Sequence, residues 1–224
     1  MWRDALLVLA KDLRIERRSK VALNQVAPFA VLILVLFAFA LDPDRGVLVR
    51  AASGLFWVAV LLSSLLAVQR SSGVEAADGV ADAQRLSGLD PAGIFLGKAA
   101  AVAVQLLLLE VLLGAGVAVL YDVHLRGIGT LVATCLVATV GLAAAGTLYG
   151  VLAAGLRVRE TLLPLLLLPV VAPVLIAATR ASENALTGYA GEVAPAAWLR
   201  LLAVFAVIYL AFGVIAYGSL MEES

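Results

Sequence analysis

The sequence predicts an all-α integral membrane protein, a bundle of six transmembrane helices forming one domain over residues 1–224. Hydrophobic residues make up 63% of the chain and charged residues 14%, and the mean hydropathy is +1.07. Soluble proteins contain only about 45–50% apolar residues, so this composition indicates a protein that folds in lipid. No segment shows the alternation of a membrane β-barrel strand, so helices are the predicted spanning form.

Six apolar runs have the length that crosses a hydrocarbon core, about 20 residues. They cover residues 23–41, 51–68, 99–121, 128–156, 161–179 and 201–220. Ala38 and Ala40, at the end of the first run, resemble a signal-peptidase site. A cleaved signal has a short basic region before about 7–15 apolar residues, whereas a long amphipathic stretch comes first here. We therefore predict an uncleaved first span.

The N-terminal residues 1–20 predict an amphipathic helix that lies on the membrane surface. Ala5, Leu6, Leu9 and Leu13 recur at helical spacing, and basic residues gather toward the end of the stretch. Such a helix buries its apolar stripe at the interface and keeps its charges in water. A basic solubilising tail is the alternative, and the ordered leucine stripe disfavours it.

The placement of Lys and Arg predicts the orientation in the cell inner membrane. Most of the 16 Lys and Arg residues fall in segments on the same side as the N-terminus. The arginines on the other side are Arg45, Arg50, Arg126, Arg180 and Arg200. The positive-inside rule then places both termini and residues 70–98 in the cytoplasm. The formal net charge is zero, so no overall basic character indicates a nucleic-acid partner.

Motifs of nucleotide binding and catalysis are missing from the sequence. There is no GxxxxGK[ST] phosphate loop, and no HExxH, GxSxG or Cys-x-x-Cys occurs. The single cysteine, Cys135, excludes an intrachain disulfide, and the single histidine, His124, argues against a metal or haem site built by this chain alone. We therefore expect a non-catalytic subunit, driven by an ion gradient or by a separate ATPase.

Residues 70–98 form the longest polar segment and predict a coupling loop. Glu75, Asp78 and Asp82 share one face of a helix at spacings of three and four, and Asp90 with Pro91 is expected to end that helix. In ATP-driven exporters with six spans, a short helix in this loop docks on the nucleotide-binding subunit. The alternative is a solvated acidic loop, and the pattern of residues supports both equally.

Four stretches within roughly the first 180 residues carry a family resemblance: "KDLRIERRS", "GLFWVAVLLSSLLAVQRS", "VEAADGVADAQRLSGLDPAGIFLGK" and "LLPLLLLPVVAPVLI". In this order they resemble the haem exporter protein B family of the cytochrome c maturation system, the CcmB family. The matching positions are Pro43, Asp44, Trp57, Glu75, Asp78, Gly79, Asp82, Leu86, Ser87, Pro91 and Lys98. This chain departs from the family pattern at Asp82, where Glu is usual, and at Gly88, where Pro is common.

The resemblance implies an ABC-2-like permease subunit of an ATP-binding-cassette complex. It implies that a cytoplasmic ATPase docks on Glu75, Asp78, Gly79, Asp82, Leu86 and Pro91. It also implies a haem-handling membrane protein, a periplasmic haem chaperone and a second copy of the chain as partners. ATP would bind the partner ATPase, and the whole complex would handle haem. The alternatives are an exporter of another lipid, drug or polysaccharide, and an ion-coupled carrier centred on Glu110.

Glu110 and Gln105 are the polar residues that stand out within the spans. A carboxylate near the middle of the third span costs about 2.5–3.5 kcal/mol on insertion scales, so it must face protein or water. Glu110 either lines a path or is a protonated acid hydrogen-bonded to a neighbouring helix, and we favour the second interpretation. Gly146 and Gly150 have the spacing that admits another helix at close range.

Three prolines and two outer segments complete the predictions. Pro164, Pro169 and Pro173 each remove a backbone donor and predict a kinked fifth span. His124 lies in the short outer segment after the third span, where an ordinary surface role is favoured over haem contact. Residues 180–200 predict either a re-entrant pair of short helices or a plain loop with an aromatic anchor.

Overall fold

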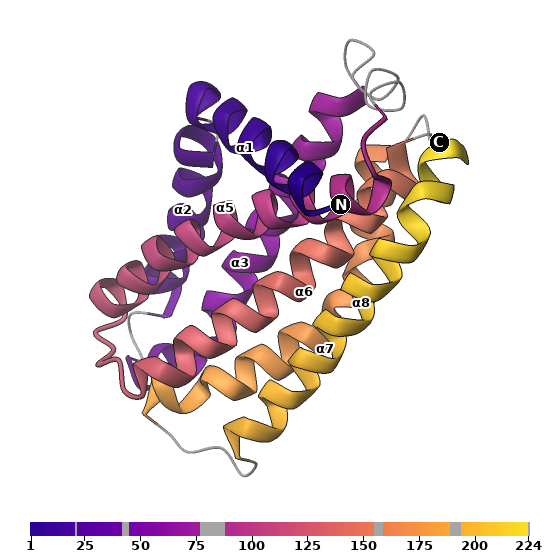
Figure 1. Cartoon of the computed structure of the whole chain (residues 1–224). Coiled ribbons are helices and arrows are strands. Elements are labelled where there is room, and N and C mark those ends of the chain that lie inside the picture. The colour runs from indigo at the N-terminus through magenta and orange to yellow at the C-terminus, as the bar shows by residue number, and fades with distance from the viewer. Residues whose placement is uncertain (21, 42–44, 77–87, 155–158, 189–193, 224) are drawn as a thin grey trace.

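The protein is a bundle of long helices with one helix lying across its end (Figure 1). The computed structural model describes residues 1–20, 22–41, 45–76, 88–154, 159–188 and 194–223. The elements are α1 (Trp2–Ser19), the π-helical turn η1 (Ala22–Val26), α2 (Ala27–Leu41), α3 (Arg45–Ala76), α5 (Pro91–Leu120), α6 (Ile128–Ala154), α7 (Arg159–Thr187) and α8 (Pro195–Glu223). Within these described residues, six helices are long and apolar enough to cross a membrane, which confirms the predicted multi-pass membrane fold.

The predicted N-terminal helix is confirmed as α1. It crosses α5 at the end of the bundle where both chain termini lie, rather than running parallel to the spans (Figure 1). Lys20 adopts a left-handed conformation, with φ of 51°, and ends the helix. η1 and α2 follow almost at once, so α1 is held close to the membrane surface.

Several of the spanning helices extend beyond the predicted apolar runs. α3 reaches Ala76 instead of ending at residue 68, and α5 begins at Pro91 instead of residue 99. The 32 residues of α3 rise by about 48 Å at 1.5 Å per residue, against a hydrocarbon core of about 30 Å. Polar helix ends extend beyond the apolar run because adding a residue to an existing helix costs little.

The segment 180–200 forms neither predicted structure in its described part. Its first residues continue α7 to Thr187, and its last residues begin α8 at Pro195. Gly188, with φ of +74°, ends α7 in the left-handed conformation that glycine adopts without strain. Proline at the start of α8 has no N–H to leave unpaired. These two residues set the helix ends that the mixed composition of this segment obscured.

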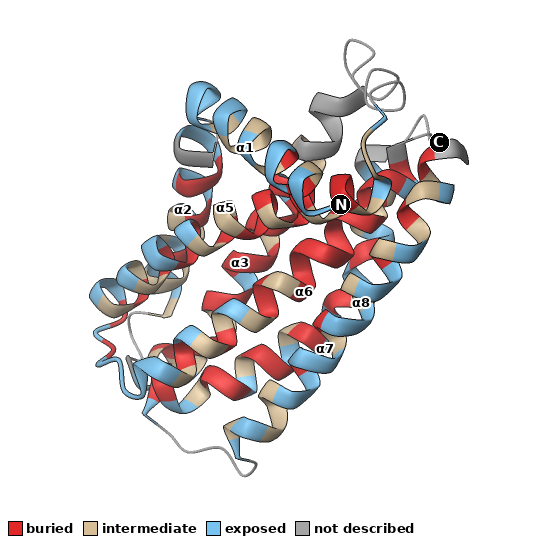
Figure 2. Cartoon of the chain, viewed as in Figure 1, coloured by how far each residue is buried: buried red, intermediate tan, exposed pale blue. Residues whose placement is uncertain are grey.

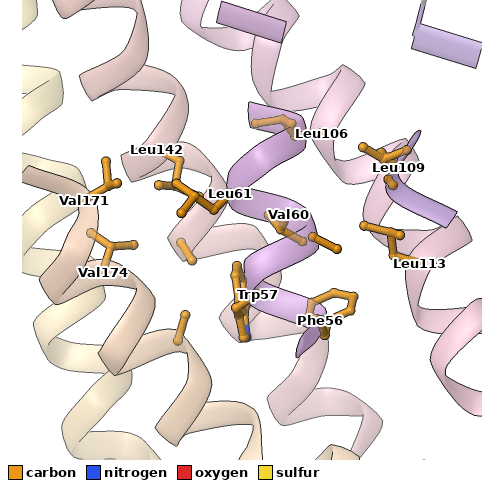
Figure 3. Packing of buried hydrophobic residues seen from close by; sticks show 14 of the residues in the cluster. Phe56, Trp57, Val60, Leu61, Leu106, Leu109, Leu113, Leu142, Val171 and Val174 are labelled. Carbon is orange, nitrogen blue, oxygen red and sulfur yellow. The ribbon is translucent and has the colours of Figure 1, made fainter. Parts of the chain in front are cut away.

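α3 is the central helix of the bundle. Of the residues in its membrane-spanning stretch, 67% are buried within the protein, against 22% for the first span and 17% for α8. Phe56, Trp57, Val60 and Leu61 of α3 pack between α5 on one side and α6 and α7 on the other (Figure 3). Lipid is as apolar as these side chains, so close packing rather than water exclusion holds the helices together.

The glycine pair predicted for helix packing lies on the buried side of α6. A Cβ atom at Gly146 would come within 2.5 Å of the Cγ2 atom of Val68 in α3, and Gly150 is also buried. Five residues earlier, a Cβ atom at Gly141 would lie 2.9 Å from the Phe205 ring of α8. At Gly146, α3 approaches α6 where a side chain is missing, which is the close approach that the glycine spacing predicts.

Candidate functional site

The helix that lies across the bundle touches α5 through two glycines. A Cβ atom at Gly93 would lie 2.7 Å from the backbone oxygen of Met1, and one at Gly97 would lie 2.6 Å from the backbone oxygen of Ala5. Both distances are shorter than a carbon–oxygen contact allows, so only glycine admits α1 at this position. The two helices therefore meet backbone to backbone within the last residues of the predicted coupling loop, 70–98.

Lys98 is covered by this contact. Its side chain is only 2% exposed, in the turn of α5 that follows Gly97. Asp12 of α1 lies close enough to interact electrostatically with the Lys98 ammonium group, and Asp12 also forms an ion pair with Lys11, with Nζ and Oδ1 3.0 Å apart. A buried charge needs such a neighbour because desolvation disfavours it. Lys98, one of the positions that carry the family resemblance, therefore lies in the contact between α5 and α1.

Asp90 and Pro91 begin α5. The sequence predicts instead that this pair ends a helix within the loop. Pro91 occupies the first helical position, and the Asp90 carboxylate accepts a hydrogen bond of 3.0 Å from the Ala92 N–H. The other Asp90 oxygen lies 3.3 Å from the Met1 amine, which also binds Asp4. These carboxylates raise the pKa of the Met1 amine, Asp4 first, and the amine lowers the pKa of Asp4.

A second contact ties the far end of α1 to α3. Arg70 lies 3.4 Å from the Glu16 carboxylate through Nε, and its Nη2 donates a hydrogen bond of 2.9 Å to the Ser19 hydroxyl. A cavity of about 20 Å³ adjoins this pair, and Gln105 lines it together with Glu16 and Arg70. Such a space holds about one water molecule. Gln105 therefore belongs to the junction of α1, α3 and α5.

Glu110 faces a different neighbour from Gln105, so the two residues do not form one polar site. The Glu110 side chain is 4% exposed, and its Oε1 accepts a hydrogen bond from the Thr139 hydroxyl of α6. The Cys135 side chain lies beside the same carboxyl group. Oε2 is buried, with no hydrogen-bonding partner in the described part of the chain. This geometry fits the interpretation of an acid bound to a neighbouring helix.

We expect Thr139→Val to destabilise the protein by about 1 kcal/mol. The substitution removes the hydroxyl that donates a hydrogen bond to the buried Glu110 carboxyl group. Replacing both partners, in Glu110→Leu with Thr139→Val, should recover part of that loss. Unfolding in SDS-titrated mixed micelles measures the stability of the wild type and of the single and double variants, and the double-mutant cycle gives the coupling energy of the pair. Additive effects of the two substitutions would show that the hydrogen bond contributes nothing.

Trp57, another family position, belongs to a buried polar network between α3 and α7. Its Nε1 donates a hydrogen bond of 2.9 Å to the Ser182 hydroxyl, which in turn donates one of 2.7 Å to the Ala178 carbonyl. Ser53 lies 2.9 Å from the same Ser182 hydroxyl and donates to the Thr179 carbonyl at 2.7 Å. The network fixes the rotation of α3 against α7, because each polar group in this apolar interior has a partner.

The remaining predicted residues lie apart from these contacts. Pro164, Pro169 and Pro173 lie inside α7, which runs as one helix from Arg159 to Thr187, so the kink stays a prediction. His124 is exposed in the segment between α5 and α6. Within the described residues, no three His, Cys, Asp or Glu side chains form a group that could hold a metal ion.

Most of the predicted ATPase-docking residues lie outside the described part of the chain. Asp78, Gly79, Asp82 and Leu86 fall in 77–87, and the side chain of Glu75 is not described either, although its backbone belongs to α3. Of the predicted set only Pro91 is placed, at the start of α5. The contact through Gly93 and Gly97 was not predicted, although it has the same Gly-x₃-Gly spacing that identified Gly146 and Gly150.

Comparison with known proteins gives the family of this chain. A family model described as CcmB protein matches residues 3–224. Relatives of this chain carry the name Heme exporter protein B. The one from Haemophilus influenzae is 32% identical over 80% of this chain and 81% of its own length. Those from Rhodobacter capsulatus and Pseudomonas aeruginosa are each 30% identical, over 83% and 94% of this chain and 85% and 94% of their own. The match extends beyond the resembling stretches to α8, and the chain belongs to the CcmB protein family.

Proposed function

We propose that this chain is the membrane permease subunit of an ATP-binding-cassette complex that acts in haem delivery during c-type cytochrome assembly. The observation that carries the proposal is the family match over residues 3–224, with relatives named Heme exporter protein B along most of their length. The six-span bundle with a surface helix supports the same class of subunit. In this proposal the cell inner membrane holds the chain, with both termini in the cytoplasm.

Energy enters through the segment between α3 and α5. This subunit is non-catalytic in the proposal, and a separate cytoplasmic ATPase binds ATP and docks on Glu75, Asp78 and Asp82. The arrangement of the helices favours this route, because α3 contacts α2, α5, α6 and α7. A force applied between the ends of α3 and α5 therefore reaches both the central helix and the helix that carries α1.

The remaining partners handle haem on the other side of the membrane. They are a haem-handling membrane protein and a periplasmic haem chaperone, and the work of the complex is to release the chaperone once it is loaded. Haem is the cargo of the complex, and its iron is held by partner subunits. The single histidine of this chain supports that division, because one histidine argues against a haem site built by this chain alone. Two copies of the chain face two ATPases.

Reversing the charge of the docking residues tests the energy route. Glu75→Lys, Asp78→Lys and Asp82→Lys together should reduce the ATPase that co-purifies with the chain by about tenfold or more, because three attractive charges become repulsive. Glu110→Gln, buried between α5 and α6, is the control that should retain the ATPase. Unchanged ATPase association in the triple variant would refute docking at these residues.

The haem assignment is tested by deleting the gene and staining membranes for covalently bound haem. We expect c-type cytochromes to be lost and to return when the wild-type chain is restored. Glu110→Gln should restore them as well, whereas an ion-coupled carrier centred on Glu110 would fail with this variant. Intact c-type cytochromes in the deletion strain would refute the proposal, and the identity of another exported molecule would then be open.

A further inference from the structure

The surface helix α1 separates its charges between two faces. Its acidic residues turn toward the protein, where each has a cation: Asp4 pairs with the Met1 amine, Asp12 with Lys11, and Glu16 with Arg70. The side chains of these three acids are 24%, 17% and 14% exposed. The acids of α1 therefore contribute little negative charge to its outer surface.

The outer face of α1 is basic and apolar. Arg3, Arg14, Arg17 and Arg18 are all exposed there. Trp2, Leu6 and Leu7 lie among them and are 71%, 64% and 61% exposed, whereas Ala5 and Val8 on the opposite face are buried. Figure 2 shows this division, with pale blue along the outer side of α1. Large apolar side chains and arginines side by side match the boundary between acyl chains and headgroups.

The chain holds this face at the membrane surface. α1 ends at Ser19 and η1 begins at Ala22, so only a few residues separate α1 from the first membrane-spanning stretch, which starts at Asn24. A residue extends the chain by at most about 3.6 Å, so α1 cannot leave the membrane surface. Gly93 and Gly97 hold it against α5, and Arg70 holds its far end against α3.

We propose that the outer face of α1 binds the headgroups of anionic phospholipids in the leaflet at the end of the bundle that carries both termini. The arginines contact the phosphates, and Trp2, Leu6 and Leu7 enter the boundary between the headgroups and the acyl chains. This surface is independent of the proposed function, since it follows from the charge and exposure of α1 alone. Its consequence is that anionic lipid stabilises α1 and, through Gly93 and Gly97, the first turns of α5.

The test measures lipid binding to the purified full-length chain with its co-purifying partners. Phosphatidylglycerol and phosphatidylcholine are titrated separately into the detergent-solubilised protein, with bound lipids counted by native mass spectrometry and the melting temperature followed in parallel. We expect the wild type to prefer phosphatidylglycerol and to gain thermal stability from it. The preference should weaken as salt is raised, because the contacts are exposed ion pairs.

The variant for this test is Arg14→Gln, Arg17→Gln and Arg18→Gln. These side chains are exposed and the inward ion pairs remain, so folding should be kept. An arginine near an anionic surface contributes about fivefold in affinity, so the triple variant should bind phosphatidylglycerol about a hundredfold more weakly. The matched control, Arg126→Gln, Arg180→Gln and Arg200→Gln, removes the same charge at the opposite end of the bundle and should keep the lipid preference.

Three results would overturn the proposal. Equal binding of the two lipids by the wild type would mean that α1 does not recognise headgroup charge. An unchanged preference in the α1 variant would place the binding elsewhere on the protein. Loss of a co-purifying protein from the α1 variant, with its lipid preference intact, would identify the outer face of α1 as a protein interface.

Discussion

Replacing Gly97 with alanine should displace α1 from α5 and destabilise the protein by about 1–3 kcal/mol, the range of overpacked interiors. The added methyl group would lie 2.6 Å from the Ala5 backbone oxygen and 2.7 Å from the Val8 Cβ atom. Neither atom is the end of a flexible side chain, so relief requires a shift of the whole helix. Faster hydrogen exchange in residues 2–19 is the expected signature, together with easier unfolding in SDS-titrated mixed micelles.

Gly114 provides the matched control for this substitution. It lies in the same helix, and a Cβ atom built there meets nothing within 4 Å. Gly114→Ala should be neutral or stabilising, because alanine is favoured over glycine inside a helix by about 1 kcal/mol. If Gly97→Ala and Gly114→Ala behaved alike, the backbone contact between α1 and α5 would not exist in the membrane.

Replacing Trp57 with alanine should have the larger effect on stability, about 3 kcal/mol or more. Trp57 is 1% exposed in the middle of the bundle, where its ring meets that of Phe56 edge to face with centroids 5.3 Å apart (Figure 3). The alanine variant leaves a cavity that its neighbours on α5, α6 and α7 cannot fill, and it removes the donor to Ser182. Unfolding in SDS-titrated mixed micelles measures the loss.

Two further variants separate packing from hydrogen bonding at Trp57. Trp57→Phe keeps most of the ring and loses only the Nε1 donor, so it should cost about 1 kcal/mol. Val58→Ala shortens the adjacent side chain, which is 41% exposed on the outer surface of α3, and should cost much less than Trp57→Ala. Equal losses for Trp57→Ala and Val58→Ala would contradict the central position of Trp57.

The number and order of the spans were predictable because hydropathy acts over whole segments. Their ends were not, since they depend on single residues that cap or stop a helix. Asp90 and Pro91 illustrate the difficulty, because the same pair suits the end of one element and the start of the next. The structure places the pair at the start of α5, where the Ala92 N–H binds Asp90.

The sequence predicts that a polar side chain within a span must find a polar partner. It does not predict which of several neighbouring helices supplies that partner. Glu110 was expected to face protein or water because a carboxyl group is costly in lipid, but only the fold shows that its partner is Thr139 on α6. Gln105, five residues earlier, faces the junction with α1 and α3. Lys98 was recognised as a family position, and its place beneath α1 emerges only from the packing of α1 on α5.

The sequence by itself determined the membrane as the solvent, the six spans, the surface helix and the family, because composition, periodicity and residue order are properties of the chain alone. Only the tertiary structure decided that α3 is the central helix and that Gly93 and Gly97 admit α1. The physical reason is that lipid is as apolar as the side chains of the bundle. The choice of neighbours therefore depends on steric fit and on individual hydrogen bonds, which become defined only when two helices meet.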